Sequence, residues 1–458
     1  MKQATLCLGP LLAALAAWAA LAGGLGADAA WTAGVTTLCA LWWVFEPIPI
    51  PATSLIPIAV FPLVGVLTAE STGAAYGSPL VLLFLGGFLL SAAMERSGAH
   101  RRIALGMVSL FGATSGRWLV CGFMLASGLL SMWISNAATT LMLLPIALAV
   151  LEGTDDDRLA GALLLGVAYA ASIGGIGTPI GTPPNLVFMQ VYARNTGESP
   201  TFLEWMTWAV PIALVMGPAA WLWLTRGLGK QSAIVLPEVG PWRPAEVRTL
   251  AVFAVTALLW VTRKEPFGGW SGWAGLPGAN DASVALLAVV AMFLIPAGGD
   301  DKHQRLLDWE SARRIPWGIL ILFGGGIAIA AAFTESGLSQ AIGESLSAAA
   351  AAPPWLLIGV TCLLVTFLTE VTSNTATATL LMPLLAAVAV GAGIDLRLMM
   401  VPAAISASFA FMLPVATPPN AIAYSAGRFT TRQMASEGLA LNLFGVVVVT
   451  AWCVWRFG

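Results

Sequence analysis

Two stretches, "SNAATTLMLLP" (residues 135–145) and "SNTATATLLMP" (residues 373–383), repeat nearly the same pattern far apart in the chain. Both place hydroxyl and amide side chains at the start of an apolar run. Polar side chains in apolar surroundings are costly unless a partner satisfies them. Two matching clusters therefore need a common physical reason, which the rest of the chain supplies.

The chain as a whole is strongly apolar. Of its 458 residues, 58% are hydrophobic and 10% are charged, and the mean hydropathy is +0.85. Soluble domains are about one quarter charged. Apolar stretches of about 20 residues recur, each long enough to cross a hydrocarbon core of about 30 Å. The composition predicts an all-α polytopic membrane protein.

Charge and cysteine usage exclude several other classes. The formal net charge is −2 and the charges are scattered over short connections, so there is no basic face for nucleic acid. His100 and His303 lie beside arginines in polar connections, and we expect them at the surface. The cysteines stand singly in apolar stretches, where we expect packing roles: Cys7, Cys39, Cys121, Cys362 and Cys453.

The first 30 residues hold one lysine, an apolar core and a small-residue end. A cleaved signal peptide is one interpretation of this pattern. The apolar stretch is long for a signal, so we predict that residues 1–30 form an N-terminal transmembrane helix that is retained.

The two halves of the chain repeat each other. "LFLGGFLLSAAMERSG" (residues 83–98) aligns with "LFGGGIAIAAAFTESG" (residues 322–337), and "GTPPN" (residues 181–185) aligns with "ATPPN" (residues 416–420). These matches keep the order and nearly the offset of the two Ser-Asn stretches, which indicates internal duplication.

The duplication predicts a domain organisation: a first repeat over residues 31–226, a polar linker over 227–247 and a second repeat over 248–458. Residues 78–94 and 316–333 are apolar, short and Gly-rich, so we predict re-entrant hairpins there. Duplicated halves that carry broken apolar segments at matching positions indicate a secondary transporter with a binding site near the bilayer midplane.

The polar clusters suit a monovalent cation. In each cluster two hydroxyls four residues apart would share a helix face beside an asparagine. Prolines cannot continue a helix, so the "GTPPN" and "ATPPN" stretches free backbone carbonyls nearby. We predict one sodium site per repeat, the second formed by Thr369, Ser373, Asn374 and the carbonyl of Ala416. The alternative for such residues is hydrogen bonding between helices.

An anion is the expected companion of these cations. Helix N-termini at the breaks offer free N–H groups and positive dipole ends. Neither cluster contains lysine or arginine. An anion bound there needs positive charge from elsewhere, and bound sodium would provide it, so binding of the two would be coupled.

These motifs, together with "WWVFEPIPIPATSLIPIAVFPLVGV" (residues 42–66), resemble the divalent anion:sodium symporter family of dicarboxylate, citrate and sulfate carriers over essentially the whole chain. The resemblance implies about 11 transmembrane spans, two inverted structural repeats with re-entrant helix hairpins and discontinuous helices, a homodimer and an elevator-type mechanism. It places the first sodium site at Ser131, Ser135, Asn136 and Gly181, and the second at Thr369, Ser373, Asn374 and Ala416. It places the substrate site at Asn136, Ala137, Thr182, Pro183, Asn374, Thr375, Thr417 and Pro418.

One position departs from the family pattern. The first motif of the family reads Ser-Asn-Thr, and here its third residue is Ala137. One hydroxyl expected to meet a carboxylate is absent, at a cost of about 1 kcal/mol. This fits a dicarboxylate bound less tightly, and equally a different anion. Glu46 and Glu370 lie in apolar segments, and we expect structural or tuning roles for both, with proton coupling through Glu370 as the alternative.

The sequence thus predicts sodium-coupled symport of a small divalent anion, such as the C4-dicarboxylate succinate, with two or more sodium ions. A sodium-independent exchanger, a proton-coupled carrier or a sulfate transporter on the same fold are the alternatives. The apolar spans contain no buried histidine, HExxH or Gly-x-Ser-x-Gly, so we expect no enzyme. Polar connections of about 20 residues are too short for a receptor domain. A compact chain with few lysines suggests a bacterial inner membrane.

Overall fold

The computed structural model describes residues 2–111, 115–151, 156–228, 240–264, 268–299, 303–346 and 353–458. Helices account for 77% of the structure. Across these ranges there is no strand, and Pro296 and Arg305 form one isolated bridge. The predicted all-α fold is confirmed. Residues 229–239 of the predicted linker lie outside the described ranges.

Eight helical stretches in the described part are long and apolar enough to cross a membrane. They are α1 (Lys2–Ala22), α5 (Ala69–Tyr76) with α6 (Pro79–Ser97), α10 (Asp157–Gly175), α12 (Phe202–Leu224), α13 (Pro244–Val261), α17 (Trp317–Glu335), α20 (Asn374–Ala392) and α23 (Thr431–Phe457). Shorter apolar helices accompany them: α3 (Ile50–Thr53) with α4 (Ile56–Val64), α8 (Gly116–Ser131), α9 (Asn136–Leu151), α15 (Asp281–Leu294), α19 (Pro354–Thr369) and α21 (Leu396–Ser406).

The remaining helices are short or carry polar side chains. They are α2 (Ala27–Phe45), α7 (Ala99–Phe111), α11 (Pro183–Thr196), α14 (Gly269–Trp273), α16 (Trp309–Ala312), α18 (Leu338–Leu346) and α22 (Pro418–Ser425).

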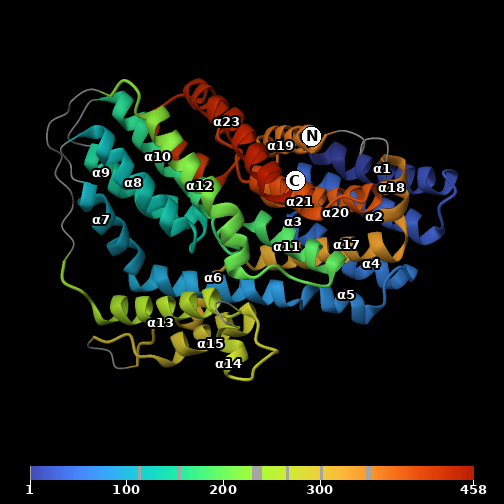
Figure 1. Cartoon of the computed structure of the whole chain (residues 1–458), viewed down its shortest axis with the longest axis horizontal. Helices are drawn as coiled ribbons and strands as arrows, with labels where there is room; N and C mark the ends of the chain where they lie inside the picture. Colours follow the sequence, from blue (N-terminus) through green and yellow to red (C-terminus); the bar gives the residue numbers. More distant parts are fainter. Residues whose placement is uncertain are drawn as a thin grey trace.

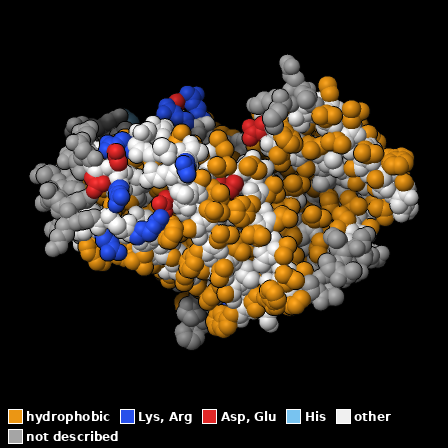
Figure 2. All heavy atoms as spheres, turned by 90° about the horizontal axis from the view of Figure 1, so that it is seen from above, with side chains coloured by type: hydrophobic (Ala, Val, Ile, Leu, Met, Phe, Trp, Pro, Cys, Tyr) orange, Lys and Arg blue, Asp and Glu red, His pale blue; other side chains and the backbone are white. Residues whose placement is uncertain are grey.

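The surface agrees with a lipid environment. Figure 2 shows hydrophobic side chains spread widely over the face in view, with most of its charged side chains at the left end. Large apolar side chains are exposed on several of the apolar helices, among them Leu63, Leu214, Leu287, Leu364 and Val447. A soluble protein would bury such residues, so the chain is an integral membrane protein.

The prediction of re-entrant hairpins over residues 78–94 and 316–333 is wrong. Both segments lie within continuous helices, α6 and α17. Their glycines permit close packing and do not break the helix: a Cβ at Gly86 would lie 2.5 Å from the Cβ of Ala285, and one at Gly324 would lie 2.2 Å from the ring of Tyr76. A Gly-rich apolar segment signals close approach as readily as a turn.

The first hairpin is formed instead by α8 and α9. Residues 132–135 make its turn, and we call this end of the hairpin the first tip. A Cβ at Gly166 would meet Met124 and one at Gly174 would meet the carbonyl of Gly128, so α10 follows α8 in the same direction. Asn136 at the start of α9 lies against Gly175 at the end of α10. Because α10 follows α9 closely in sequence, α9 must run back along α10. Figure 1 shows the three helices together at the left.

The second repeat has the same arrangement. The hydroxyl of Thr369, the last residue of α19, donates to the carbonyl of Ala407, just beyond α21, at 3.0 Å. The helix α20 starts beside this point and leads closely into the start of α21. Thus α19 and α20 form a hairpin whose tip lies at the end of α21, as the tip of α8 and α9 lies at the end of α10.

The two repeats have opposite orientation. Phe84 on α6 and Phe323 on α17 stack on one another. On one side of this stack Ser91 shares a cavity with Gly318, and on the other side Leu83 shares a cavity with Ile327. Therefore α6 and α17, which are equivalent in sequence, run in opposite directions, as inverted repeats require.

Candidate functional site

The hairpin tips and helix breaks of both repeats meet at one cavity of about 820 Å³. Its walls also include residues of α2, α3, α6 and α17. All residues predicted to meet the substrate line it: Asn136, Ala137, Thr182, Pro183, Asn374, Thr375, Thr417 and Pro418. Parts of the chain far apart in sequence thus converge on a space large enough for a small organic anion.

The first tip concentrates oxygen atoms. The hydroxyl of Ser131 donates to Asn136 Oδ1 at 2.5 Å, and Ser131 is fully buried behind the cavity wall. Ser135 lies in the turn between α8 and α9, and its hydroxyl accepts a hydrogen bond from the N–H of Ala138 at 3.2 Å. The expectation that Ser131 and Ser135 share a helix face is wrong, because α8 ends at Ser131. The turn of the hairpin brings these polar residues together.

Gly181 lies in the break between α10 and α11, and it allows the backbone of this break to approach the first tip. A Cβ there would lie 2.3 Å from the carbonyl oxygen of Gly175 and 3.0 Å from that of Ser131. The backbone after α10 is held open by Asn185, whose amide donates to the carbonyls of Gly175 at 3.2 Å and Thr178 at 2.8 Å. The carbonyl, hydroxyl and amide oxygens around Gly181 are the neutral ligands that a hard monovalent cation prefers.

The second tip repeats this chemistry. The Thr369 hydroxyl donates to Asn374 Oδ1 at 2.8 Å, and Thr369 is fully buried. Ser373 stands just before α20 with an extended backbone, so here too Thr369 and Ser373 do not share a helix face as expected. Ala416 and Ser373 both line the cavity. Thr369 and Ser131 lie behind the wall, each joined to its tip asparagine.

The sequence interpretation missed how the breaks are held. Asn420, the counterpart of Asn185, donates to the carbonyls of Ala410 at 2.8 Å and Leu413 at 3.0 Å. Both asparagines are fully buried. The signal was visible as the last residue of each "TPPN" stretch. An asparagine there replaces hydrogen bonds that the prolines cannot donate.

Four helices begin at the cavity, namely α9, α11, α20 and α22. Each N-terminus carries a partial positive charge, and α9 and α20 also offer free N–H groups, whereas α11 and α22 each begin with two prolines that have none. Among the described residues that line the cavity, Glu46 alone is ionisable. Among the described lining residues, positive charge therefore comes from helix ends alone, because the cavity contains no arginine or lysine.

The two intramembrane acids have different settings. Glu46 caps the end of α2 with φ of 46°, a backbone conformation unusual for a non-glycine residue, and lines the cavity. Glu370 is buried away from it and accepts hydrogen bonds from the N–H groups of Met412 at 2.9 Å and Leu413 at 3.0 Å, and from the Asn442 amide at 2.6 Å. These contacts give Glu370 a structural role in the second break, the segment between α21 and α22.

Comparison with known proteins agrees with the motifs. The sequence model of the "Citrate transporter" family matches residues 40–401. The sodium-dependent dicarboxylate transporter SdcS of Staphylococcus saprophyticus is 39% identical, over 97% of this chain and 89% of its own length. SdcS of Staphylococcus aureus strain NCTC 8325 is 38% identical over the same shares.

Two solved structures share the fold. The YdaH transporter of Alcanivorax borkumensis superimposes with a TM-score of 0.59 at 15% identity, covering 86% of this chain and 88% of its own. MtrF of Neisseria gonorrhoeae, from a class of antimetabolite efflux pumps, gives 0.62 at 16% identity, covering 87% and 85%. At this identity the likeness concerns the fold alone. The match to the citrate transporter family model and the identity with the SdcS relatives show that this chain belongs to the divalent anion:sodium symporter family that its motifs indicate.

Proposed function

We propose that this protein is a secondary active transporter that couples sodium entry to the uptake of a small divalent anion, a C4-dicarboxylate such as succinate. The observation that carries the proposal is the convergence of both Ser/Thr-Asn tips and both helix breaks on one cavity. The family membership and the sodium-dependent dicarboxylate transport named for the SdcS relatives support it.

The charge balance of the cavity supports coupling. A dianion next to Glu46 and no lining cation is unfavourable unless cations bind with it. Two unit charges about 6 Å apart interact by about 3 kcal/mol at an effective dielectric constant of about 20. That energy changes an affinity by more than about a hundredfold. Sodium ions at the tips would therefore strengthen anion binding.

We assign one sodium ion to each tip, which makes the stoichiometry at least two. The first site comprises Ser131, Ser135, Asn136 and Gly181, and the second Thr369, Ser373, Asn374 and Ala416. The convergence of carbonyl oxygens at Gly181 supports the first. The hydrogen bond from Thr369 to Asn374 supports the second, because it points the same oxygen types at the tip.

We assign the substrate carboxylates to the Asn-Ala pair of the first tip and the Asn-Thr pair of the second. Thr182, Pro183, Thr417 and Pro418 border them. Because Ala137 offers no hydroxyl, the first carboxylate has one donor fewer than the second.

Movement and assembly complete the proposal. The residues of the tips and breaks line the cavity together with residues of α2, α3, α6 and α17. This arrangement suits an elevator-type mechanism in which the tips and breaks move past these helices. The repeats, residues 31–226 and 248–458, follow the N-terminal helix (1–30) and flank the linker (227–247). The homodimer proposal rests on the family resemblance.

Uptake into liposomes tests the proposal. Labelled succinate is offered with an inward sodium gradient and then with choline in place of sodium, with sulfate and citrate as unlabelled competitors. We expect uptake that needs sodium and is lost in Asn374→Ala, while Asn195→Ala, on an exposed helix end, retains it. Sodium-independent uptake would favour the exchanger or proton-coupled alternative. Succinate uptake that sulfate, but not citrate, reduces would indicate sulfate as the substrate.

A further inference from the structure

A second cavity, of about 420 Å³, lies on the other side of the Phe84–Phe323 stack. Its polar lining includes Ser78, Gln190, Arg194, Ser199, Arg263 and Asp281. We call it the arginine cavity. In contrast to the cavity at the hairpin tips, it contains cationic side chains.

The two cavities lie along the same helices. On α11 the first cavity meets Pro183 and the arginine cavity meets the segment up to Arg194. A void of about 10 Å³, bordered by Val187 and Phe323, adjoins the arginine cavity and shares Gln190 and Ile327 with it. The Phe84 and Phe323 rings are each 1% exposed. The cavities thus occupy two parts of one route, separated by an aromatic barrier.

The arginines of the chain indicate which face the arginine cavity opens to. Most gather at the ends of α6, α12 and α15 and the starts of α8, α10 and α13, the charged end in Figure 2. This group contains Arg96, Arg101, Arg102, Arg117, Arg158, Arg226, Arg243, Arg248, Arg305, Arg313 and Arg314. Short connections rich in arginine lie on the cytoplasmic side of a membrane.

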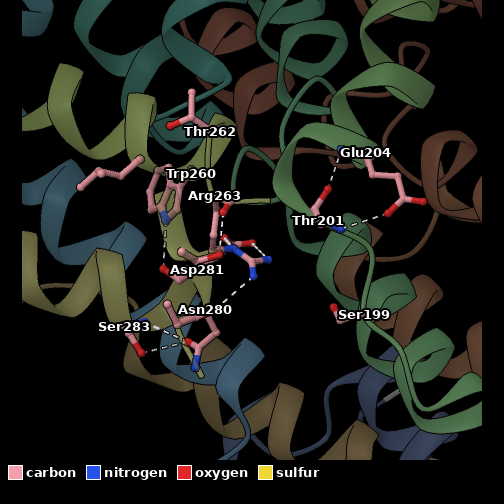
Figure 3. A network of polar contacts seen from close by, with 12 residues as sticks. Ser199, Thr201, Glu204, Trp260, Thr262, Arg263, Asn280, Asp281 and Ser283 are labelled. Atoms are coloured by element: carbon pink, nitrogen blue, oxygen red, sulfur yellow. Dashed lines mark hydrogen bonds and ion pairs between the residues drawn. The ribbon is translucent and has the colours of Figure 1, made fainter. Parts of the chain in front are cut away.

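The arginine cavity lies at the opposite ends of these helices, where α6, α12 and α15 begin and α13 ends. It therefore opens to the outer face. Arginine and lysine are sparse on that face, and two of its arginines line this one cavity. Figure 3 shows Arg263, Asn280 and Asp281 on one side of this region and Ser199 and Thr201 across from them.

The two arginines are bound differently. Arg263 Nε and Nη2 donate to the Asp281 carboxylate at 2.5 and 3.3 Å, so its charge is matched. Among the described residues, Arg194 forms a single ion pair, a contact of 3.9 Å with the exposed carboxylate of Glu335 that solvent screens. Gln190 is 7% exposed and its amide nitrogen has no hydrogen-bond partner within the described residues. The cavity has one cation in excess and a spare donor.

We propose that the arginine cavity is an outer binding site for the small dicarboxylate dianion, which Arg194 captures before the dianion reaches the hairpin tips. Arg263 and Asp281 form the rigid wall against which the anion is held. The identity of the anion rests on the proposed function, whereas the site and its sidedness rest on the cavity and the distribution of arginines. A focused positive potential at a cavity mouth raises the capture rate of anions.

Thiol labelling tests sidedness and binding without transport. Cys7 and Cys121, the native cysteines that are not buried, are replaced by alanine. Ala193→Cys reports on the arginine cavity and Gly240→Cys on the arginine-rich face. In right-side-out vesicles an impermeant thiol reagent should modify Ala193→Cys and not Gly240→Cys. Excess succinate should slow the modification of Ala193→Cys several-fold, and the additional substitution Arg194→Gln should remove that protection. Labelling from the inner face only, or no protection, would overturn the site.

Transport kinetics provide the second test. Arg194→Gln should raise the KM for external succinate by about tenfold, with unchanged sodium half-saturation and unchanged maximal rate, and Arg194→Lys should restore most of the loss. Arg432→Gln, an exposed arginine that lines neither cavity, is the matched control. Sodium-dependent wild-type uptake with a normal KM in Arg194→Gln would overturn this inference alone. Sodium-independent wild-type uptake would contradict the proposed function and leave the labelling test standing.

Discussion

Phe84 and Phe323, which hold equivalent positions in the two repeats, stack with ring centroids 4.6 Å apart. Because α6 and α17 run in opposite directions, the pair lies where the two inverted repeats meet. The cavity at the hairpin tips lies on one side of the pair and the arginine cavity on the other. A pair of side chains related by the duplication thus separates the two halves of the proposed route.

Removing one ring should weaken this barrier. Phe323→Ala leaves a void next to one that already exists, and burial loss of this kind costs about 3 to 5 kcal/mol. We expect a lower melting temperature and a sodium-independent leak of succinate in liposomes. Phe457→Ala, at the end of α23, is the control for loss of an aromatic ring elsewhere. A destabilised variant that remains tightly coupled would contradict the barrier role.

The first sodium site depends on the absence of a side chain at Gly181. In Gly181→Ala the new Cβ would lie 2.3 Å from the Gly175 carbonyl oxygen, so the tip and the break must separate. Overpacking of this kind costs about 1 to 3 kcal/mol. The sodium concentration for half-maximal uptake should rise about tenfold or more.

Gly217→Ala is the matched control for this substitution, since a Cβ there meets nothing within 4 Å. Its sodium dependence should equal that of the wild type. An unchanged sodium dependence in Gly181→Ala would place the cation elsewhere.

Glu370 should act through the second break. Its carboxylate accepts from Met412, Leu413 and Asn442, and in Glu370→Gln an NH₂ group would face one of these donors. A buried donor left unpaired costs about 1 to 3 kcal/mol. We expect a loss of thermal stability and weaker sodium binding, measured by thermal unfolding across sodium concentrations.

Glu310→Gln provides the comparison for Glu370→Gln, because Glu310 pairs with Arg313 and Arg314 at exposed positions, where ion pairs contribute little. If Glu370→Gln kept its stability and lost only the dependence of transport on a proton gradient, the proton-coupled alternative would replace the structural role.

Ala137→Thr should restore a donor at the first tip. Ala137, at the second position of α9, lines the same cavity as the Asn-Thr pair of the second tip. One added hydrogen bond contributes about 1 kcal/mol, which corresponds to an affinity about fivefold higher. Competition binding with succinate in saturating sodium measures this change. Ala138→Thr, one position further into α9, should have no such effect. Weaker succinate binding in Ala137→Thr would indicate that the alanine accommodates a different anion.

The sequence was sufficient to predict which residues meet, but the path that brings them together was not visible in it. The duplicated "SN" and "TPPN" stretches identified the residues around the cavity, because polar side chains in an apolar chain are informative by themselves. Gly181 could be assigned only through the family resemblance. The close approach of Gly175 and Ser131 to it is a tertiary fact that no local pattern contains.

The hairpins show why the rest escaped prediction. Glycines in α6 and α17 looked like turns, yet they admit Ala285 and Tyr76, residues distant in sequence. The true turns after Ser131 and Thr369 contain neither glycine nor proline. They are stabilised by the tip asparagines and by Thr178, whose hydroxyl donates to the carbonyl of Met132. Such contacts are not visible in hydropathy.

Reciprocal binding tests the central claim, coupling of anion and sodium in one cavity, most directly. Equilibrium binding of labelled succinate to the purified protein is measured across sodium concentrations, and sodium binding across succinate concentrations. The account predicts that each ligand raises the affinity for the other by the same factor, as linkage requires. Succinate binding that is tight and indifferent to sodium would contradict it.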